Sequence, residues 1–207
     1  MKDEVTVGTA EEMRDLGRDL ARLLRAGDLV ILSGPLGAGK TTLTQGIGEG
    51  LGVRGRVTSA TFVIARVHRV VPPSNRAAPY SPPRRAFAAS QVPRHGGGTA
   101  PLERGDHAPR TPEALVHVDA YRLGNALELD DLDLDTDLDT SVTVVEWGEG
   151  LAEGLAADRL EIAITPAGPP GADSFGEGDE PRTLRITGVG PRWQDVRMPR
   201  ADVSDRL

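Results

Sequence analysis

The chain has 207 residues, of which 38% are hydrophobic and 3% aromatic, so it can bury one largely aliphatic core. A formal net charge of −7 argues against a protein that binds nucleic acid chiefly by neutralising phosphates, because such proteins are usually basic. Cysteine is absent, which excludes a disulfide scaffold, a thiolate zinc site and a cysteine nucleophile. The sequence shows neither the apolar region of a signal peptide nor a run long enough to span a membrane, so we expect a cytoplasmic protein without membrane contact.

Hydrophobic patterning predicts strands that alternate with helices. The first helix, at 10–25, begins with Thr9 as its N-cap and Glu12 three residues later, which is the pattern of a capping box. The apolar run at 29–32 is typical of a strand buried on both faces, and a glycine-rich turn and a helix at about 40–50 follow it. Further elements are predicted as strands at 4–7, 61–67, 115–119, 142–146, 159–165 and 183–187, and as a short helix at 148–157. This alternation favours an α/β fold with a mostly parallel central sheet.

One segment interrupts the pattern. Residues 72–113 contain nine prolines, six arginines and three acidic residues among 42 positions, without apolar periodicity. Such a composition is typical of disorder, and a structureless loop of this length is uncommon inside a compact domain. We therefore predict a single domain over 1–190 that is interrupted by a disordered Pro/Arg-rich insertion at 72–113. A C-terminal tail without clear pattern follows at 191–207.

The strongest motif lies between the strand at 29–32 and the helix that follows it. Residues 34–41 match G-x-x-x-x-G-K-[ST] in full, and the glycines allow several backbone N–H groups to face one phosphate at a helix N-terminus. In such a P-loop Lys40, one of only two lysines, reaches the β- and γ-phosphates, and the Thr41 hydroxyl ligates Mg²⁺. A glycine-rich turn without a ligand is the alternative. The expected nucleotide contacts are Gly34, Gly37, Ala38, Gly39, Lys40, Thr41 and Thr42.

Two carboxylates stand at the ends of later predicted strands. Asp119 ends the strand at 115–119, and Glu146 ends the strand at 142–146. Parallel strands would bring both side chains to the crevice that holds the P-loop, where an acidic residue usually positions Mg²⁺. The alternatives are a helix N-cap for Asp119 and a solvated acid for Glu146.

The acidic segment at 128–139 raises the possibility of a calcium site. An EF-hand loop needs glycine at its sixth position and glutamate at its twelfth, and neither register of this segment supplies them. A solvated acidic face is the better interpretation, with partner docking as the alternative. The four histidines show no metal-ligand spacing, so no second metal site is expected.

Four segments together match the pattern of a known family. They are GPLGAGKTT at 34–42, SATF at 59–62, HVDAYRL at 117–123 and VEWGE at 145–149. With these segments the chain resembles the TsaE family, small P-loop ATPases of bacterial tRNA threonylcarbamoyladenosine synthesis. The resemblance covers roughly residues 5–190 and departs from the family's S-P-T-[FY] pattern at Ala60. Without the proline, that loop is expected to be less rigid.

The resemblance implies a P-loop NTPase-like three-layer sandwich that binds ATP. It implies Mg²⁺ held by Thr41 and Glu146, a catalytic or switch role for Asp119, and contact between Trp147 and the nucleotide. Together with Lys40, Asp119 and Glu146 form the expected catalytic set. The implied partners are TsaD and TsaB, which transfer the threonylcarbamoyl group to adenosine 37 of tRNA, so that tRNA is reached only indirectly. The ATPase would reset that complex.

Two other function classes fit the P-loop. A small-molecule kinase needs a substrate pocket and usually an arginine-bearing lid that closes over the phosphates. The insertion at 72–113 contains arginines, but its proline content and its lack of a helical pattern argue against its being such a lid. A nucleotide-binding regulator without useful hydrolysis is the third class. Labelled ATP with and without partner proteins separates the three.

Overall fold

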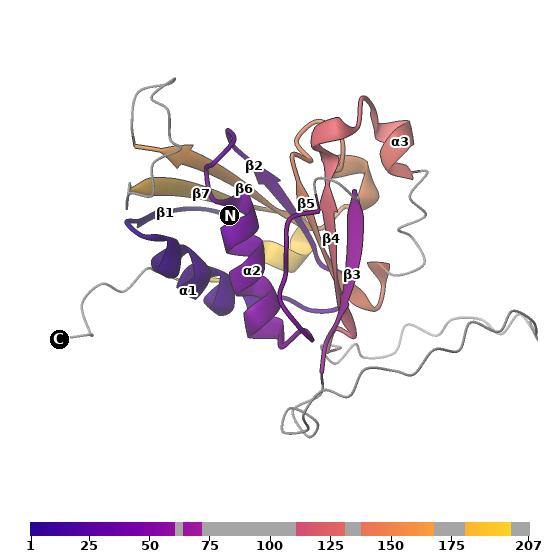
Figure 1. Cartoon of the computed structure of the whole chain (residues 1–207), viewed down its shortest axis with the longest axis horizontal. Helices are drawn as coiled ribbons and strands as arrows, with labels where there is room; N and C mark the ends of the chain where they lie inside the picture. Colours follow the sequence, from indigo (N-terminus) through magenta and orange to yellow (C-terminus); the bar gives the residue numbers. More distant parts are fainter. Residues whose placement is uncertain (61–63, 72–110, 131–137, 168–180, 200–207) are drawn as a thin grey trace, which may run out of the picture.

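A computed structural model of the chain describes residues 1–60, 64–71, 111–130, 138–167 and 181–199. Seven strands of this part form one mixed sheet in the order β1-β7-β6-β2-β5-β4-β3 (Figure 1). The strands are β1 (Lys2–Val7), β2 (Leu29–Ser33), β3 (Ala65–Arg69), β4 (Ala114–Asp119), β5 (Ser141–Glu146), β6 (Arg159–Pro166) and β7 (Arg182–Val189).

The middle of the sheet is parallel and its edges are antiparallel. β2 lies at the centre and pairs in parallel with both β5 and β6, and β4 continues the parallel order beside β5. β3 closes one edge and β7 with β1 the other, each through antiparallel pairing. Every residue of β4 and β5 is buried, including their polar residues His117, Asp119, Ser141, Thr143 and Glu146. The predicted α/β fold with a mostly parallel central sheet is confirmed.

Helices α1 (Ala10–Ala21) and α2 (Lys40–Leu51) lie side by side on one face of the sheet (Figure 1). The Thr9 hydroxyl accepts a hydrogen bond from the Glu12 N–H at 3.1 Å, and the Glu12 carboxylate accepts from the Gly8 N–H at 2.6 Å. The predicted N-cap and its glutamate partner are thus both in place, and they fix where α1 begins.

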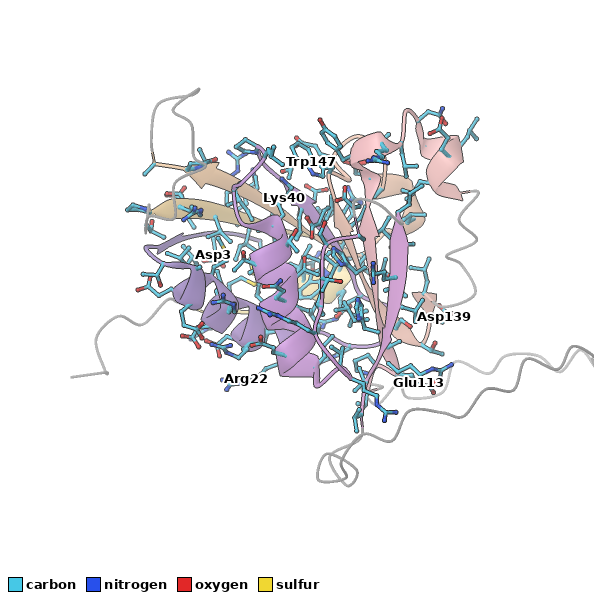
Figure 2. All side chains as sticks on the ribbon, viewed as in Figure 1. Asp3, Arg22, Lys40, Glu113, Asp139 and Trp147 are labelled. Atoms are coloured by element: carbon cyan, nitrogen blue, oxygen red, sulfur yellow. The ribbon has the colours of Figure 1, made fainter. Side chains whose placement is uncertain are left out.

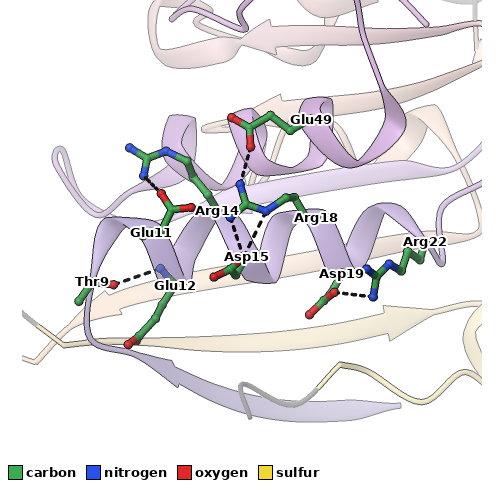
Figure 3. Close-up of polar contacts among 9 residues, drawn as sticks. All are labelled: Thr9, Glu11, Glu12, Arg14, Asp15, Arg18, Asp19, Arg22 and Glu49. Carbon is green, nitrogen blue, oxygen red and sulfur yellow. Dashed lines mark hydrogen bonds and ion pairs between the residues drawn. The ribbon is translucent and has the colours of Figure 1, made fainter. Parts of the chain in front are cut away.

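The two helices approach one another at backbone distance. A Cβ atom on Gly17 of α1 would lie 2.6 Å from the Leu43 carbonyl oxygen, and one on Gly46 of α2 would overlap the Arg14 carbonyl oxygen. Above this contact Arg18 forms ion pairs with Glu11, Asp15 and Glu49, the last on α2 (Figure 3). Because these side chains are partly exposed, the ion pairs add little stability, and the close glycine contact fixes the helix pair.

The two faces of the sheet carry separate apolar clusters. Under α1 and α2 the larger cluster joins aliphatic side chains of the sheet to both helices. The smaller cluster on the other face is covered by the short α3 (Ala126–Asp130) and by 3-10 turns at Ala120–Arg122 and Glu153–Leu155. In the part of the chain that the structure describes, no helix is long and apolar enough to cross a membrane.

Several predicted elements differ from those observed. The predicted helix at 148–157 is wrong, since only a 3-10 turn forms at Glu153–Leu155. Gly150 has φ 79°, a left-handed conformation that stops helix propagation. The first helix ends at Ala21 instead of residue 25, because i→i−3 hydrogen bonds tighten its last turn.

The predicted strand at 61–67 is observed from Ala65 to Arg69, and residues 61–63 lie outside the described ranges.

The chain remains packed beyond residue 190. Trp193 is fully buried in the cluster under α1 and α2, and Met198 is 8% exposed. Arg192 donates hydrogen bonds to both carboxylate oxygens of the buried Asp28 and to the Leu23 carbonyl oxygen. The domain therefore includes residues that the sequence pattern assigns to the tail. A single buried tryptophan packs this segment, and one apolar residue produces no periodic pattern that a sequence analysis could detect.

The predicted insertion at 72–113 falls mostly on residues outside the described ranges. Its last residue belongs to the sheet, since the Glu113 N–H donates to the Thr140 carbonyl oxygen and its carbonyl accepts from the Val70 N–H. Val70 and Glu113 lie directly beyond the paired ends of β3 and β4 and are joined by a hydrogen bond, so a short connection can join the two strands there.

Replacing residues 73–110 with a short Gly-Asn linker is therefore expected to leave the melting temperature within a few degrees of the parent chain. The removed sequence offers too little apolar surface to offset the entropy of ordering it. Thermal melts followed by circular dichroism test this expectation. A deletion that also removes Glu113 serves as the comparison and should cost stability, and a large drop on removing 73–110 alone would contradict the prediction.

Candidate nucleotide-binding site

The turn between β2 and α2 has the backbone conformation that its glycines allow. Gly34, Gly37 and Gly39 have φ values of 138°, 78° and 103°, all in the range that other residues rarely adopt. Gly39 is the N-cap of α2 and provides no side-chain acceptor for the first N–H groups of the helix. The start of α2 is therefore arranged to receive an anion. The Ala38 N–H donates to the Pro35 carbonyl oxygen at 3.2 Å, a long bond that a phosphate oxygen could replace.

Lys40 is held inside this turn. Its side chain is 5% exposed, and Nζ donates hydrogen bonds to the carbonyl oxygens of Gly34 and Pro35, both at 2.8 Å. Nζ also lies 3.6 Å from the centroid of the Trp147 ring, and Figure 2 shows both residues at the same end of the sheet. Burial lowers the pKa of Lys40 to about 8, although the charges of Glu146 and Asp119 act in the opposite direction.

Glu146 and Thr41 are 105 positions apart in sequence and form a direct contact. The Thr41 hydroxyl donates to Glu146 Oε2 at 2.9 Å. Glu146 Oε1 is bonded to the Thr44 hydroxyl at 3.3 Å and to His117 Nε2 at 2.7 Å. Glu146 is 2% exposed, so the alternative of a solvated acid is wrong. The carboxylate is thus buried and held by polar contacts at both of its oxygens.

Asp119 lies beside Glu146, since the two are paired in the parallel register of β4 and β5. Parallel pairing therefore brings the two strand-end carboxylates to the same edge of the sheet, as the sequence predicts. Asp119 Oδ1 also accepts from the Tyr121 N–H at 3.1 Å and caps the 3-10 turn at Ala120–Arg122. Asp119 therefore acts as an N-cap through Oδ1, as the alternative interpretation predicts. This capping role is compatible with a chemical role for the same carboxylate.

Trp147 contacts both the P-loop lysine and Tyr121. Its φ of 60° is unusual for an aromatic residue and marks local strain of the kind found at functional sites. Its ring contacts both the Lys40 ammonium and the Tyr121 ring, whose centroid is 5.1 Å away and whose plane is tilted by 56°. Tyr121 is 62% exposed, so this aromatic contact reaches the protein surface. Thr42 is half-buried on the first turn of α2.

Three residues of this cluster are not among the predicted site residues, namely Thr44, His117 and Tyr121, although the last two lie in the HVDAYRL segment. A periodicity argument could have found two of them. Thr44 lies four positions after Lys40 and so one helical turn along the same face. His117 lies two positions before Asp119 and so on the same face of β4.

The donor set is suited to magnesium bound together with a phosphate chain. Across the described ranges no group of three or more His, Cys, Asp or Glu side chains could hold a metal ion by itself. Thr41 and Glu146 offer one hydroxyl and one carboxylate, and Mg²⁺ typically takes one or two such ligands together with phosphate oxygens and water. The residues at positions 131–137 of the acidic segment lie outside the described ranges.

Because the pKa of Lys40 is lowered, the free energy of unfolding of the nucleotide-free chain is predicted to depend on pH. Between pH about 8 and 10.5 the unfolded chain binds more protons at Lys40 than the folded chain, so stability rises with pH in that window. A Lys40→Met variant lacks this dependence. We expect its free energy of unfolding, relative to the parent, to fall by up to about 3 kcal/mol across the window.

Urea denaturation at several pH values measures this change. Lys2→Met, at an exposed lysine, is the matched control and should keep a constant difference from the parent. A Lys40→Met difference that stays flat over the same window would show that Lys40 keeps an ordinary pKa.

Comparison with known proteins identifies the family of the chain. The model of the family described as "Threonylcarbamoyl adenosine biosynthesis protein TsaE" matches residues 7–76 and 106–169. The chain belongs to the TsaE family. The matched ranges contain every candidate site residue and leave out most of the predicted insertion.

Individual TsaE proteins match over most of their length. The chain is 52% identical to a Streptomyces coelicolor protein over 183 residues, which cover 87% of this chain and 93% of that one. Identity to a Mycobacterium tuberculosis protein is 43% over 165 residues, covering 77% and 76%. A Bacillus subtilis protein is 30% identical over 185 residues, covering 89% and 84%. All three are named tRNA threonylcarbamoyladenosine biosynthesis protein TsaE.

A solved structure shares the architecture. The crystal structure of Bacillus subtilis YdiB superposes with a TM-score of 0.53 at 26% sequence identity, covering 93% of this chain and 89% of that one. The P-loop-like α/β fold predicted from sequence is therefore confirmed by both the strand order and a solved relative.

Proposed function

We propose that the chain is an ATP-binding protein and a Mg²⁺-dependent ATPase that serves tRNA threonylcarbamoyladenosine biosynthesis in the cytoplasm. The observation that carries the proposal is the contact between the Thr41 hydroxyl and Glu146 beside a P-loop lysine. A P-loop turn, a hydroxyl and a strand-end carboxylate are the three parts that nucleotide hydrolysis on such a fold requires. The names of the TsaE relatives support the assignment to tRNA modification.

Each residue has a separate task in this proposal. Nucleotide phosphates would lie against the N–H groups of the turn from Gly34 to Thr42, and Lys40 would exchange its two carbonyl partners for phosphate oxygens. Thr41 and Glu146 would hold Mg²⁺, which neutralises negative charge on the β- and γ-phosphates. Trp147 would lie against the bound nucleotide, given its place over Lys40.

Asp119 is the candidate for orienting the attacking water. It lies on the strand next to Glu146, at the same edge of the sheet. Asp119 would accept the proton of the attacking water, since Glu146 would face the metal through the oxygen that contacts Thr41. Lys40, Asp119 and Glu146 thus form the proposed catalytic set.

We propose TsaD and TsaB homologues as partners, with tRNA reached only through them. The exposed Tyr121 ring and the exposed Leu36 at the tip of the P-loop, 62% and 68% accessible, provide apolar surface at the mouth of the site. Apolar side chains around a catalytic site are typical of a partner surface. A partner bound there would contact the Tyr121 ring beside Trp147 directly.

The test is phosphate release from γ-labelled ATP with purified TsaD and TsaB homologues present or absent. We expect release to increase when both partners are added, and the Lys40→Ala chain mixed with the same partners is the control. Label transferred to a metabolite in a cell extract would instead indicate a kinase. Binding of ATP without either product would indicate a regulator and contradict the proposed hydrolysis.

A further inference from the structure

His117 lies behind the proposed metal ligand and has no role in the function proposed so far. It sits in the middle of β4, is completely buried, and places Nε2 at 2.7 Å from Glu146 Oε1. We infer that His117 is a positioning residue that orients the Glu146 carboxylate toward Mg²⁺, an inference that rests on the proposed function.

The two oxygens of Glu146 face different ways. Oε2 receives the Thr41 hydroxyl, and Oε1 contacts His117 Nε2 at 2.7 Å. The Thr44 hydroxyl lies 3.3 Å from Oε1, but its shorter bond, at 2.9 Å, is to the Lys40 carbonyl oxygen, so His117 is the main partner of Oε1. With Oε1 bonded to the core, the carboxylate cannot rotate without breaking a short buried hydrogen bond. Oε2 is therefore presented toward Thr41, the other proposed metal ligand. Hydrogen-bonded partners of this kind typically change metal affinity ten- to a hundredfold when they are removed.

The strand pairing makes this contact a consequence of the fold. In the register of β4 and β5, His117 is opposite Val144 and Asp119 is opposite Glu146. His117 is therefore the diagonal neighbour of Glu146 on the same face of the sheet, within reach of a long side chain. Neither side chain needs a loop to hold it in place, so the distance between them is set by the sheet.

The inference requires one tautomer of His117. A carboxylate that binds a metal only accepts hydrogen bonds, so His117 Nε2 would be the donor of the 2.7 Å contact. Among the described residues, His117 Nδ1 is buried without a hydrogen-bond partner. Within the described part of the chain, the contact with Glu146 is therefore the one polar contact of the His117 ring. A histidine that only filled the core would be expected to have both ring nitrogens satisfied or to be replaced by an apolar residue.

A neighbouring histidine provides a matched control. His68 on β3 lies with its ring centroid 6.5 Å from that of His117, and its Nε2 is likewise buried without a partner in the described part of the chain. His68 is not among the donors to Glu146. A His68→Leu variant therefore changes a similar side chain in the same region and leaves the carboxylate untouched.

The experiment follows ATP binding by tryptophan fluorescence while Mg²⁺ is titrated, and repeats the binding curve in EDTA. His117→Leu removes the donor and keeps an apolar volume, whereas His117→Gln keeps an N–H donor near the same position. We expect His117→Leu to raise the Mg²⁺ concentration for half-saturation roughly ten- to a hundredfold and to leave ATP affinity in EDTA unchanged. His117→Gln should recover most of the loss, and His68→Leu should match the parent.

A second readout needs neither nucleotide nor metal. Long-range proton–nitrogen NMR spectra of the nucleotide-free parent chain should show His117 protonated at Nε2. Protonation at Nδ1 alone would overturn the inference, and this result stands even if His117→Leu does not fold.

The outcomes separate the inference from the proposed function. If the parent chain responds to Mg²⁺ and His117→Leu responds identically, only the inference is overturned. Equal losses of affinity in Mg²⁺ and in EDTA would also overturn it, because they indicate a general structural role. If ATP binding to the parent chain shows no response to Mg²⁺ at all, the proposed function fails and the inference fails with it.

Discussion

Replacing Lys40 with alanine is expected to abolish ATP hydrolysis and to weaken ATP binding while the domain remains folded. In the nucleotide-free chain the Lys40 ammonium is buried against two carbonyl oxygens and the Trp147 ring, so its charge is directed at the space that phosphates would enter. Charge-assisted contacts to phosphate are typically worth about 1.5–3 kcal/mol each, which gives losses of roughly tenfold to a hundredfold or more.

Isothermal titration with ATP and a phosphate-release assay measure the two effects. Lys2→Ala removes the other lysine, which is exposed on β1, and should behave as the parent chain does. Thr41→Ala should retain nucleotide binding and weaken its dependence on Mg²⁺, because only the proposed metal contact is lost. Unchanged hydrolysis in Lys40→Ala would overturn the P-loop assignment.

Exchanging the two strand-end carboxylates for amides is expected to separate binding from turnover. Asp119→Asn keeps an oxygen that can cap the turn at Ala120–Arg122, so the local structure should survive while the charge is lost. Mg²⁺-ATP binding should remain nearly intact and turnover should collapse, because an interaction made chiefly in the transition state affects rate more than ground-state binding.

Glu146→Gln is expected to act through the metal. The amide can keep its bonds to Thr41 and His117 in part, but it no longer offers a negative charge, so ATP affinity should respond less to Mg²⁺. Fluorescence of Trp147 on nucleotide addition, with Trp193 as a buried background signal, reports binding in both variants. If Asp119→Asn loses ATP binding as severely as Lys40→Ala, Asp119 belongs to the binding set and the division of roles is wrong.

The parts of the fold that sequence predicts well are those whose local pattern and tertiary environment agree. The run at 29–32 is apolar at every position and becomes the central strand β2, buried on both sides. The turn after it requires left-handed backbone at three glycines, so motif and conformation coincide. Strands β4 and β5 end in the carboxylates expected of them, and parallel pairing then brings Asp119 beside Glu146.

The remaining features depend on contacts that no local pattern carries. The helix predicted at 148–157 is prevented by glycine, since Gly150 takes a left-handed conformation inside the apolar pattern. Trp193 enters the core from a segment without periodicity. The role of His117 depends on the register between two strands that are far apart in sequence, and a search for metal-ligand spacing cannot detect a residue that supports a ligand from behind.

The contact between Gly17 and Gly46 has a mechanical consequence. Where two helices touch through their backbones, neither can tilt or slide without a steric overlap, so the helix that carries the P-loop is fixed to α1 as one rigid half of the molecule. Trp147 and Tyr121 contact one another outside this helix pair, and the backbone at Ile64 has φ 66°. Under the proposed function, a displacement on ATP binding would be taken up by these residues, and the exposed Tyr121 ring would carry it to the surface.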